Sequence, residues 1–327
     1  MKEAVFLGLD VAKLNFEACL LLPDGKALKN KFQNTPVGFS KLLVWLGGLE
    51  LTEIFACLEP TGVYSRRLAN FILQSGMRVS QVNSYTVQCY GRSKNFRSKT
   101  DRIDAYLLAD YCRTQNPPVW DPPAPTQSEL KEVQRRLASL DEQIRQEENR
   151  LDVCEFSVVR DDIEENLGRL YVRRKKLETV ASSLVKSDEV MARNFKILNS
   201  IIGIGEKSAL RLLALVQFEK FTSGRQVGCF AGLTPRAFDS GTSVHKKPRI
   251  SRIGSSELRA GLYFPAMVAI QCNPQMRAFA ERLKAKGKPP KVVICAVMRK
   301  LLVLATTLIR NQQFYDPQFH PELSITP

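Results

Sequence analysis

Short apolar runs and amphipathic runs alternate along residues 1–115. Apolar runs bounded by turn residues are typical of buried strands, and apolar positions three and four apart are typical of helices. The pattern predicts strands at Val5–Val11, Asn15–Leu22, Ala27–Gln33, Ile54–Leu58 and Met77–Val82, and helices at Phe39–Leu49, Tyr64–Leu73 and Asp101–Tyr111. Asp24-Gly25 is a hairpin turn signal, so the second and third strands are expected to pair antiparallel. This order predicts an α/β fold in which helices cover a mixed sheet.

Five prolines between Asn116 and Pro125 mark the clearest boundary in the chain. Proline cannot continue a helix or a central strand, so this stretch is expected to be a stiff, extended linker. We therefore expect a globular domain over 1–115, a Pro-rich linker over 116–126, a helical segment over 127–186 and a mainly α-helical domain over 187–327.

The segment after the linker carries a heptad seam. Its apolar residues are Leu130, Val133, Leu137, Leu140, Ile144 and Leu151, with charged residues between them. A second polar helix is expected from about Val158 to Leu184. Such seams pair helices with one another. Two arrangements remain open: an antiparallel hairpin that packs within its own domain, and a coiled coil between chains that would make the protein a homo-oligomer.

Two glycines, Gly203 and Gly205, precede the amphipathic run Leu210–Val216. Glycines before a helix N-terminus leave backbone N–H groups open to a phosphate. Many helix–turn–helix corners contain the same pair, so the sequence favours phosphate contact and a plain corner equally. Further core helices are expected at Leu258–Ala269 and Val292–Ile309.

Charge changes this picture, because 48 Lys and Arg residues outweigh 33 Asp and Glu residues and give a net charge of +15. A balance this basic indicates a nucleic acid or an anionic membrane surface as partner. The most apolar stretch, Val292–Ile309, contains Arg299 and Lys300, and the N-terminus lacks a signal-peptide layout, which favours nucleic acid over a membrane. The eight cysteines include no CxxC pair, which favours a cytoplasmic protein without disulfides or zinc. Two histidines argue against zinc and Ser-His-Asp chemistry.

Four acidic residues stand out against this basic background. Asp10 interrupts the first predicted strand and Glu59 ends the fourth, and a carboxylate in a buried strand is costly unless it is paired or binds a metal. Asp101 and Asp104 lie three apart at the start of a predicted helix, on one face. Converging carboxylates repel one another unless cations lie among them. Hard oxygen ligands of this kind suit one or two Mg²⁺ or Mn²⁺ ions, which assist phosphoryl displacement.

Asp101 has a simpler explanation when it is considered alone. Ser98 lies three residues earlier, so the two residues could form a capping arrangement in which the acid favours the helix dipole. That explanation does not account for Asp10 or Glu59. The four acids together therefore favour a metal site.

A second candidate site surrounds Ser240, which precedes Gly241 in a turn-like segment that should expose its hydroxyl. The cations that follow could hold a scissile phosphate; they are Lys246, Lys247, Arg249 and Arg252. On local sequence alone, a surface turn beside a basic loop is the better interpretation. A serine nucleophile also needs activation, for which Asp239, His245 or the distant carboxylates are the choices.

Two further basic runs suit contacts with a nucleic-acid backbone, although such runs are more often solvated surface. The first comprises Arg92, Lys94, Arg97, Lys99 and Arg102, and the second Lys284, Lys286, Lys288 and Lys291.

In order and spacing, these motifs resemble the insertion-sequence transposases of the "one-ten" group, which includes the Piv/MooV-like DNA invertases and the bridge-RNA-guided recombinases. The resemblance spans nearly the whole chain. Asp10 in Gly-Leu-Asp-Val-Ala-Lys matches the first acid of their D-E-D-D tetrad, and Glu59 in Leu-Glu-Pro-Thr-Gly matches the second. Asp101 and Asp104 in Lys-Thr-Asp-Arg-Ile-Asp-Ala match the last two. Ser240-Gly241 corresponds to the segment that carries a nucleophilic serine, and Gly203-Ile-Gly205 to a helix–hairpin–helix-like element.

The resemblance implies a RuvC-like, RNase H-fold domain, a coiled coil and a transposase domain. It implies a DNA transposase or site-specific recombinase in which Ser240 forms a phosphoserine intermediate with DNA and the tetrad, with Mg²⁺, supports that step. Donor and target DNA, a structured guide RNA and further copies of the chain, as a dimer or tetramer, are the implied partners. The residues alone leave two alternatives: a metal-dependent RuvC-like junction endonuclease and a non-catalytic nucleic-acid-binding scaffold.

Overall fold

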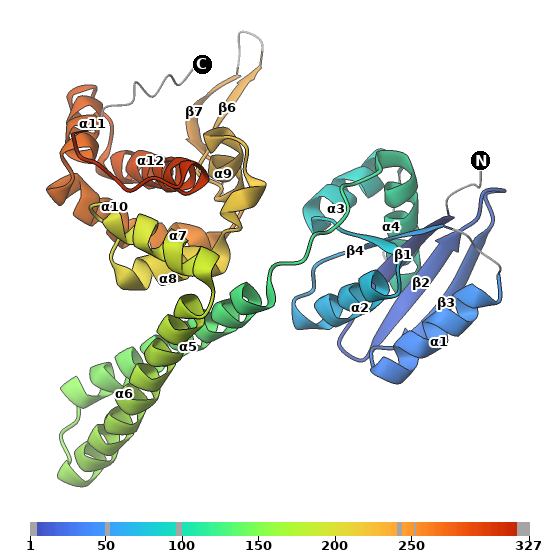
Figure 1. The fold of residues 1–327 in the computed structure, drawn as a ribbon, viewed down its shortest axis with the longest axis horizontal. Coiled ribbons are helices and arrows are strands. Elements are labelled where there is room, and N and C mark those ends of the chain that lie inside the picture. The colour runs from blue at the N-terminus through green and yellow to red at the C-terminus, as the bar shows by residue number, and fades with distance from the viewer. Residues whose placement is uncertain (1–4, 50–52, 96–99, 241–243, 252, 319–327) are drawn as a thin grey trace. The chain divides into compact units, whose positions relative to one another are not determined.

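The computed structural model describes residues 5–49, 53–95, 100–240, 244–251 and 253–318 (Figure 1). For Asp101 and for residues 237–248, only the backbone within these ranges is described. The chain divides into two compact units, Met1–Pro122 and Pro123–Pro327.

The N-terminal unit is built on a five-stranded mixed sheet, which confirms the predicted α/β architecture. Its strands are β1 (Val5–Val11), β2 (Asn15–Leu21), β3 (Ala27–Gln33), β4 (Ile54–Leu58) and β5 (Arg78–Gln81), in the order β3-β2-β1-β4-β5. β1, β2 and β3 pair antiparallel, while β4 lies parallel to β1 and β5 parallel to β4. The turn between β2 and β3 contains Gly25 at a φ of 85°, as the Asp24-Gly25 signal predicts.

Helices cover both faces of this sheet (Figure 1). On one face α1 (Pro36–Gly47) and α2 (Val63–Gln74) pack on Leu7 and Leu9 of β1. On the other face α4 (Asp101–Gln115) packs on Phe55 and Cys57 of β4, with α3 (Ser84–Ser93) against it. Because side chains alternate along a strand, the even positions of β1 and the odd positions of β4 face α4. The sequence pattern did not predict α3, which begins at an Asn83 cap.

Two long helices open the C-terminal unit and form an antiparallel hairpin, α5 (Pro125–Asp152) and α6 (Ser157–Lys186). The heptad seam of α5 is used inside the chain. Leu140 and Ile144 are buried against Ile163, Leu167 and Leu170 of α6. At its start, Leu130 instead joins the core of the helical unit. The hairpin, one of the two arrangements that the sequence left open, is the one that the structure contains.

The remaining helices form the main core of the C-terminal unit. They are α7 (Glu189–Ser200), α8 (Glu206–Leu215), a 3-10 turn (Phe218–Lys220), α9 (Gly224–Phe230), α10 (Ser256–Cys272), α11 (Pro274–Ala285) and α12 (Pro290–Asn311). A two-stranded ribbon, β6 (Pro235–Ser240) and β7 (Val244–Ile250), lies between α9 and α10 in sequence. By length and composition α12 could cross a membrane, but half of its apolar stretch is buried against the rest of the protein. Val297, Leu301 and Ala305 are buried in this unit's core, so α12 is a core helix here.

Candidate active site

Two of the four predicted acids lie at the same level on neighbouring strands. In the parallel pairing of β1 with β4, Leu9 is opposite Leu58, so the next residues, Asp10 and Glu59, follow side by side. Asp10 continues the even positions of β1 and Glu59 the odd positions of β4, which places both on the α4 side of the sheet. Both residues are half-buried.

The first turns of α4 approach this corner of the sheet because β1 has a glycine there. A Cβ on Gly8 would lie 1.9 Å from the carbonyl oxygen of Ala105 and 2.4 Å from the backbone nitrogen of Ala109. Only a residue without a side chain permits backbones this close. Gly8 is two residues before Asp10 on the same face, and Ala105 directly follows Asp104. The contact therefore holds Asp104, which is also half-buried, at the end of the sheet where Asp10 lies.

The start of α4 is fixed by Thr100, whose side chain accepts a hydrogen bond from the backbone N–H of Ile103 at 3.3 Å. The cap is therefore Thr100, and the alternative in which Ser98 caps this helix is wrong; Ser98 itself lies outside the described residues. Asp101 is the first helical residue, and its side chain is not described. Both aspartates lie in the first two turns, where the positive end of the helix dipole favours negative charge.

The turn after β4 holds Glu59 through its backbone. The N–H of Thr61 donates to the Glu59 carbonyl oxygen at 3.0 Å and to the Ser65 hydroxyl at 2.8 Å. Gly62 has a φ of 71°, a conformation that favours glycine, and lets the chain turn sharply into α2. The Glu-Pro-Thr-Gly sequence thus forms a defined turn that carries the acid.

A fifth carboxylate lies beside this set, and the sequence pattern did not single it out. Glu17 of β2 pairs directly across from Asp10 in the antiparallel register, so the two side chains share the α4 face. Glu17 is 7% exposed and forms a 3.0 Å salt bridge with Lys31 of β3. The available signal was Glu17 itself, the one charged residue in a strand that is apolar at every other position from Phe16 to Leu21.

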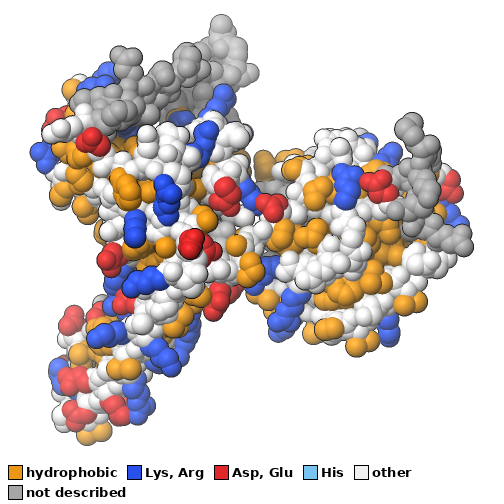
Figure 2. Space-filling model, in the orientation of Figure 1, with side chains coloured by type: hydrophobic (Ala, Val, Ile, Leu, Met, Phe, Trp, Pro, Cys, Tyr) orange, Lys and Arg blue, Asp and Glu red, His pale blue; other side chains and the backbone are white. Residues whose placement is uncertain are grey.

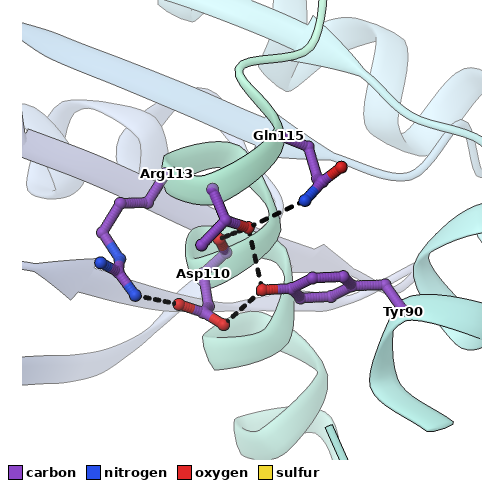
Figure 3. A network of polar contacts seen from close by, with 5 residues as sticks. Tyr90, Asp110, Arg113 and Gln115 are labelled. Atoms are coloured by element: carbon purple, nitrogen blue, oxygen red, sulfur yellow. Dashed lines mark hydrogen bonds and ion pairs between the residues drawn. The ribbon is translucent and has the colours of Figure 1, made fainter. Parts of the chain in front are cut away.

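Further along α4, a polar network joins this helix to α3 (Figure 3). The Asp110 carboxylate accepts hydrogen bonds from Arg113 at 2.6 Å and from the Tyr90 hydroxyl at 2.7 Å. Burial alone would raise the pKa of Asp110, but these bonds and the charges of Arg113 and Lys94 hold it below its ordinary value. Lys94 also lies over the Tyr90 ring, 5.6 Å from its centroid. The network therefore fixes the end of α3, where the basic run begins.

Carboxylates from β1, the β4 turn and α4 supply the hard oxygen donors that Mg²⁺ and Mn²⁺ prefer. The fold brings Asp10, Glu59 and Asp104 to one end of the sheet. Among the side chains that the structure describes, which exclude Asp101, no three acidic, histidine or cysteine groups are close enough to hold an ion. The donor chemistry is of the kind that suits a divalent cation.

The second predicted site lies in the C-terminal unit, at the far end of the β6–β7 ribbon. Ser240 is the last residue of β6 and pairs with Val244, while Asp239 pairs with His245. Ser240 therefore ends a strand, although its side chain is not described. The predicted Gly241, and Arg252 beyond β7, lie outside the described residues.

The predicted nucleic-acid contacts are distributed over both units. Arg92 and Lys94 are exposed at the end of α3, and Arg249 is exposed on β7. Arg97 and Lys99 lie outside the described residues, and for Lys246 and Lys247 only the backbone is described.

The two glycines before α8 differ in environment. Gly203 has a φ of 109°, and a Cβ there would lie 2.6 Å from the Cβ of Ala269, so the helix corner alone accounts for it. Gly205 is the N-cap of α8, is exposed and has open space around it. Of the two, Gly205 is the one whose surroundings leave room for a phosphate.

Two family models match this chain. Residues 7–154 match a model for DEDD-type IS110 transposases, described as "Transposase", and this range contains all four predicted acids. Residues 195–281 match a model described as "Transposase IS116/IS110/IS902 family", and this range contains Ser240.

Similarity to individual proteins extends over a longer part of the chain and indicates the same family. The chain is 30% identical over 320 residues to the pilin gene-inverting proteins of Moraxella bovis and Moraxella lacunata, which covers 96% of this chain and 98% of each relative. It is 24% identical over 162 residues to an uncharacterized protein of insertion element IS110 from Streptomyces coelicolor, covering 49% of this chain and 39% of that protein.

Proposed function

This chain belongs to the IS110 family of transposases, and on that basis we propose that it is the recombinase of an insertion sequence, which cuts and rejoins DNA with an acidic metal site in the N-terminal unit and the Ser240 nucleophile. Family membership makes it a DNA recombinase of the transposase and invertase type, and implies DNA as substrate. Beyond family membership, we propose a bound metal ion, a serine–DNA intermediate and a guide RNA.

The observation that carries the acidic site is the side-by-side position of Asp10 and Glu59 on two central parallel strands, facing the first turns of α4. Three separate elements contribute carboxylates to one end of one sheet, which supports an RNase H-like assignment for this unit. Asp10, Glu59 and Asp104 would hold the divalent cation, with Asp101 as the fourth acid. Mg²⁺ is the expected ion and Mn²⁺ a workable substitute.

A bound cation would supply positive charge that stabilises the oxygens of a phosphodiester during displacement. The carboxylates would orient that charge. The backbone that carries them is fixed by strand β1 at Asp10, by the hydrogen bond from the Thr61 N–H to the carbonyl oxygen of Glu59, and by the Gly8–Ala105 contact next to Asp104. Rigid placement matters because small displacements of catalytic groups are costly in rate.

In the proposed cleavage step, the Ser240 oxygen forms a bond to a DNA phosphorus while the bond to one DNA ester oxygen breaks. The serine proton passes to a carboxylate or to solvent, and the departing DNA hydroxyl gains a proton. A hydroxyl of another DNA end then displaces Ser240, which restores the free serine and joins the strands. One phosphoester replaces another in each step, so no external energy source is needed.

The acids and Ser240 belong to different compact units, and the Pro-rich stretch 116–124 lies between them. We infer that the complete site combines the acids of one protomer with the serine of another, which would keep single chains inactive until a dimer or tetramer assembles on DNA. A structured guide RNA is the proposed second nucleic-acid partner, and the +15 net charge supports binding of two polyanions. The reaction would take place in the cytoplasm, at the nucleoid.

Strand transfer on donor and target DNA tests the acidic site. Asp10→Asn and Asp104→Asn should abolish recombination while nucleic-acid binding persists, and Asp162→Asn, an exposed residue on α6, is the matched control. Full activity in EDTA would contradict the metal site.

Covalent trapping on nicked DNA, followed by mass spectrometry, tests the nucleophile. Ser240→Ala should bind RNA and DNA yet give no adduct. An adduct on Ser243 would show that the nucleophile is wrongly placed. Cleavage by Ser240→Ala would favour the junction endonuclease, and binding without any metal-dependent strand transfer by the unaltered chain would favour the scaffold.

A further inference from the structure

The helix α10 exposes an uncharged, mainly apolar face, although it already buries its opposite face in the core of the C-terminal unit. From Ala260 to Cys272 the helix contains no charged residue. A helix that is apolar on all sides is normally buried on all sides. The exposed residues of this face, together called the α10 stripe, are Ala260, Tyr263, Phe264, Met267, Val268 and Gln271.

The α10 stripe is one continuous surface of the helix. At about 100° per residue, its six positions fall within an arc of about 140°. The rings of Tyr263 and Phe264 contact each other edge to face, with their centroids 5.7 Å apart. The buried positions lie on the other side of the helix and are Leu258, Leu262, Ala266 and Ala269.

Packing at both ends of α10 prevents the helix from turning this stripe inward. A Cβ on Gly203, in the corner before α8, would lie 2.6 Å from the Cβ of Ala269 and 3.0 Å from the carbonyl oxygen of Pro265. At the start of the helix, the N–H of Ser255 donates to the carbonyl oxygen of Phe230 at 3.1 Å. A cover for the stripe therefore has to come from outside this core.

The α10 stripe differs from the solvated helices of the same unit. Acidic and basic side chains are interspersed over the α5–α6 hairpin (Figure 2), and several form ion pairs, such as Arg174 with Asp141. Nucleic-acid phosphates are bound chiefly through Lys and Arg, which the stripe lacks. An exposed apolar face of this kind is typical of a contact with another protein surface.

The sequence of the stripe is matched to a second copy of itself. When two copies of α10 pair antiparallel about a two-fold axis at Phe264, Ala260 of each copy faces Val268 of the other, because both lie four residues from the axis. A small side chain then meets a larger one on both sides of the axis. Interfaces between identical subunits around a two-fold axis require such self-complementarity.

The charges at the two ends of α10 favour the same arrangement. Glu257 lies in the first turn, 3.8 Å from the Arg135 Nε atom, and its side chain is 41% exposed. At the other end, Arg277 of α11 donates to the carbonyl oxygen of Gln271. Glu257 and Gln271 each lie seven residues from Phe264, so antiparallel pairing brings the carboxylate of one copy towards the guanidinium of the other. The helix dipoles also oppose each other in this pairing.

We propose that the α10 stripe is an interface between two copies of this chain, in which the two helices pair antiparallel around Phe264. This interface rests on the multi-chain assembly proposed above and assigns part of it to named residues. Because α10 follows the β6–β7 ribbon in sequence, the pairing places two ribbons, each ending β6 at Ser240, towards opposite ends of the helix pair. Protein contacts alone then set the spacing of the two serines, before DNA binds.

Sedimentation equilibrium of the full chain in EDTA, without nucleic acid, tests the association. Phe264→Glu opposes two like charges at the axis and should raise the dissociation constant of the dimer at least about tenfold. Phe156→Glu, between α5 and α6, is the matched control, because Phe156 is 73% exposed and Phe264 is 72% exposed. An unaltered chain that stays monomeric, or equal effects of the two variants, would overturn the proposal.

A short thiol-specific cross-linker tests the antiparallel register. Chains with Ala260→Cys, mixed with chains with Val268→Cys, should cross-link to each other more than either cross-links to itself. Phe264→Cys should cross-link to itself, with Phe156→Cys as the measure of random linkage. The background for all four variants is a chain in which Ser replaces the exposed cysteines Cys89, Cys229 and Cys272.

Preferential linkage of position 260 to 260 and of 268 to 268 would show a parallel pairing and contradict the proposed interface. Linkage at random levels in every mixture would show that something other than a second copy covers the stripe. Neither experiment involves DNA cleavage. Failure here is therefore distinguishable from failure of the proposed function, which the strand-transfer and adduct experiments measure.

Discussion

Gly8 and Ala105 meet so closely that a single methyl group on Gly8 would lie 1.9 Å from the Ala105 carbonyl oxygen. This contact joins the central strand to the helix that carries Asp104, so packing and the placement of the acids depend on the same pair of residues. Gly8 lies two residues before Asp10, and Ala105 directly follows Asp104. Because Gly8 has no side chain, these two positions can lie in contact.

Gly8→Ala should therefore lower the free energy of unfolding of the N-terminal unit by about 1–3 kcal/mol or more, because the extra methyl group forces β1 and α4 apart. Both tryptophans, Trp45 and Trp120, belong to this unit, so denaturant unfolding followed by tryptophan fluorescence reports on it. Gly47→Ala on α1 of the same unit, where a Cβ meets nothing within 4 Å, is the control and should be neutral or slightly stabilising. Equal behaviour of the two variants would contradict the close contact.

Glu17→Gln should weaken the metal dependence of recombination rather than the fold. Glu17 lies across from Asp10 and adds negative charge next to a proposed metal ligand, so it acts as a positioning residue. Residues in this role typically change metal affinity or activity about 10- to 100-fold. The Mg²⁺ concentration for half-maximal strand transfer should rise, with unfolding nearly unchanged because Lys31 remains largely solvated. An unchanged Mg²⁺ requirement would leave Glu17 a purely structural partner of Lys31.

Asp110→Asn should destabilise the N-terminal unit by about 1–3 kcal/mol, since it removes the charge that Arg113 and Tyr90 satisfy. The pKa of Asp110 is lowered in the folded chain, so its stabilising contribution is present above the unfolded pKa of about 3.9 and is lost as the pH falls through the folded value. The stability difference from the unaltered chain should be constant from about pH 7 to pH 5 and should shrink below about pH 4. A difference that grows on acidification would contradict this assignment.

Leu140→Lys should unfold the α5–α6 hairpin instead of merely separating chains. Leu140 is fully buried between α5 and α6, and a charge there would cost about 3 kcal/mol or more. Loss of helical circular dichroism at a lower temperature is the expected result. Val172→Lys, on an exposed position of α6, should leave the transition unchanged. If Leu140→Lys halves the mass in sedimentation while the helices stay intact, the seam serves association after all.

Sequence patterns predicted the sheet well because its signals are local. The alternation in β1 to β4, the Asp24-Gly25 turn and the start of α4 at Asp101 all follow from neighbouring residues. The sequence pattern did not predict helix α3 because this segment is largely polar. Only Val87 and Gly91 are buried, so the helix lacks a clear apolar face. The predicted start of α4 at Asp101 is correct, and the cap is Thr100 rather than Ser98, the alternative that the sequence also allowed.

The sequence predicted that the acids of the candidate site converge, but not which other residues surround them. Asp10 and Glu59 were visible because a charge in an apolar run is unusual. Glu17 becomes a neighbour of Asp10 only through the antiparallel register of β1 with β2, and the Gly8 contact depends on how α4 crosses the sheet. Pairing register and helix packing are set by long-range contacts, which a local pattern does not contain.

The hairpin has a hydrophobic core separate from that of the helices at its base, because Leu140, Ile144, Ile163, Leu167 and Leu170 contact one another as a cluster of their own. The end of the hairpin with this separate core can therefore be altered without changing the core of the other helices. Removing matched whole turns from α5 and α6 would shorten the arm while the two apolar faces stay in register. The arm could equally be exchanged with that of a relative as one piece, which makes its length a variable that engineering can set independently of the sheet that carries the acids.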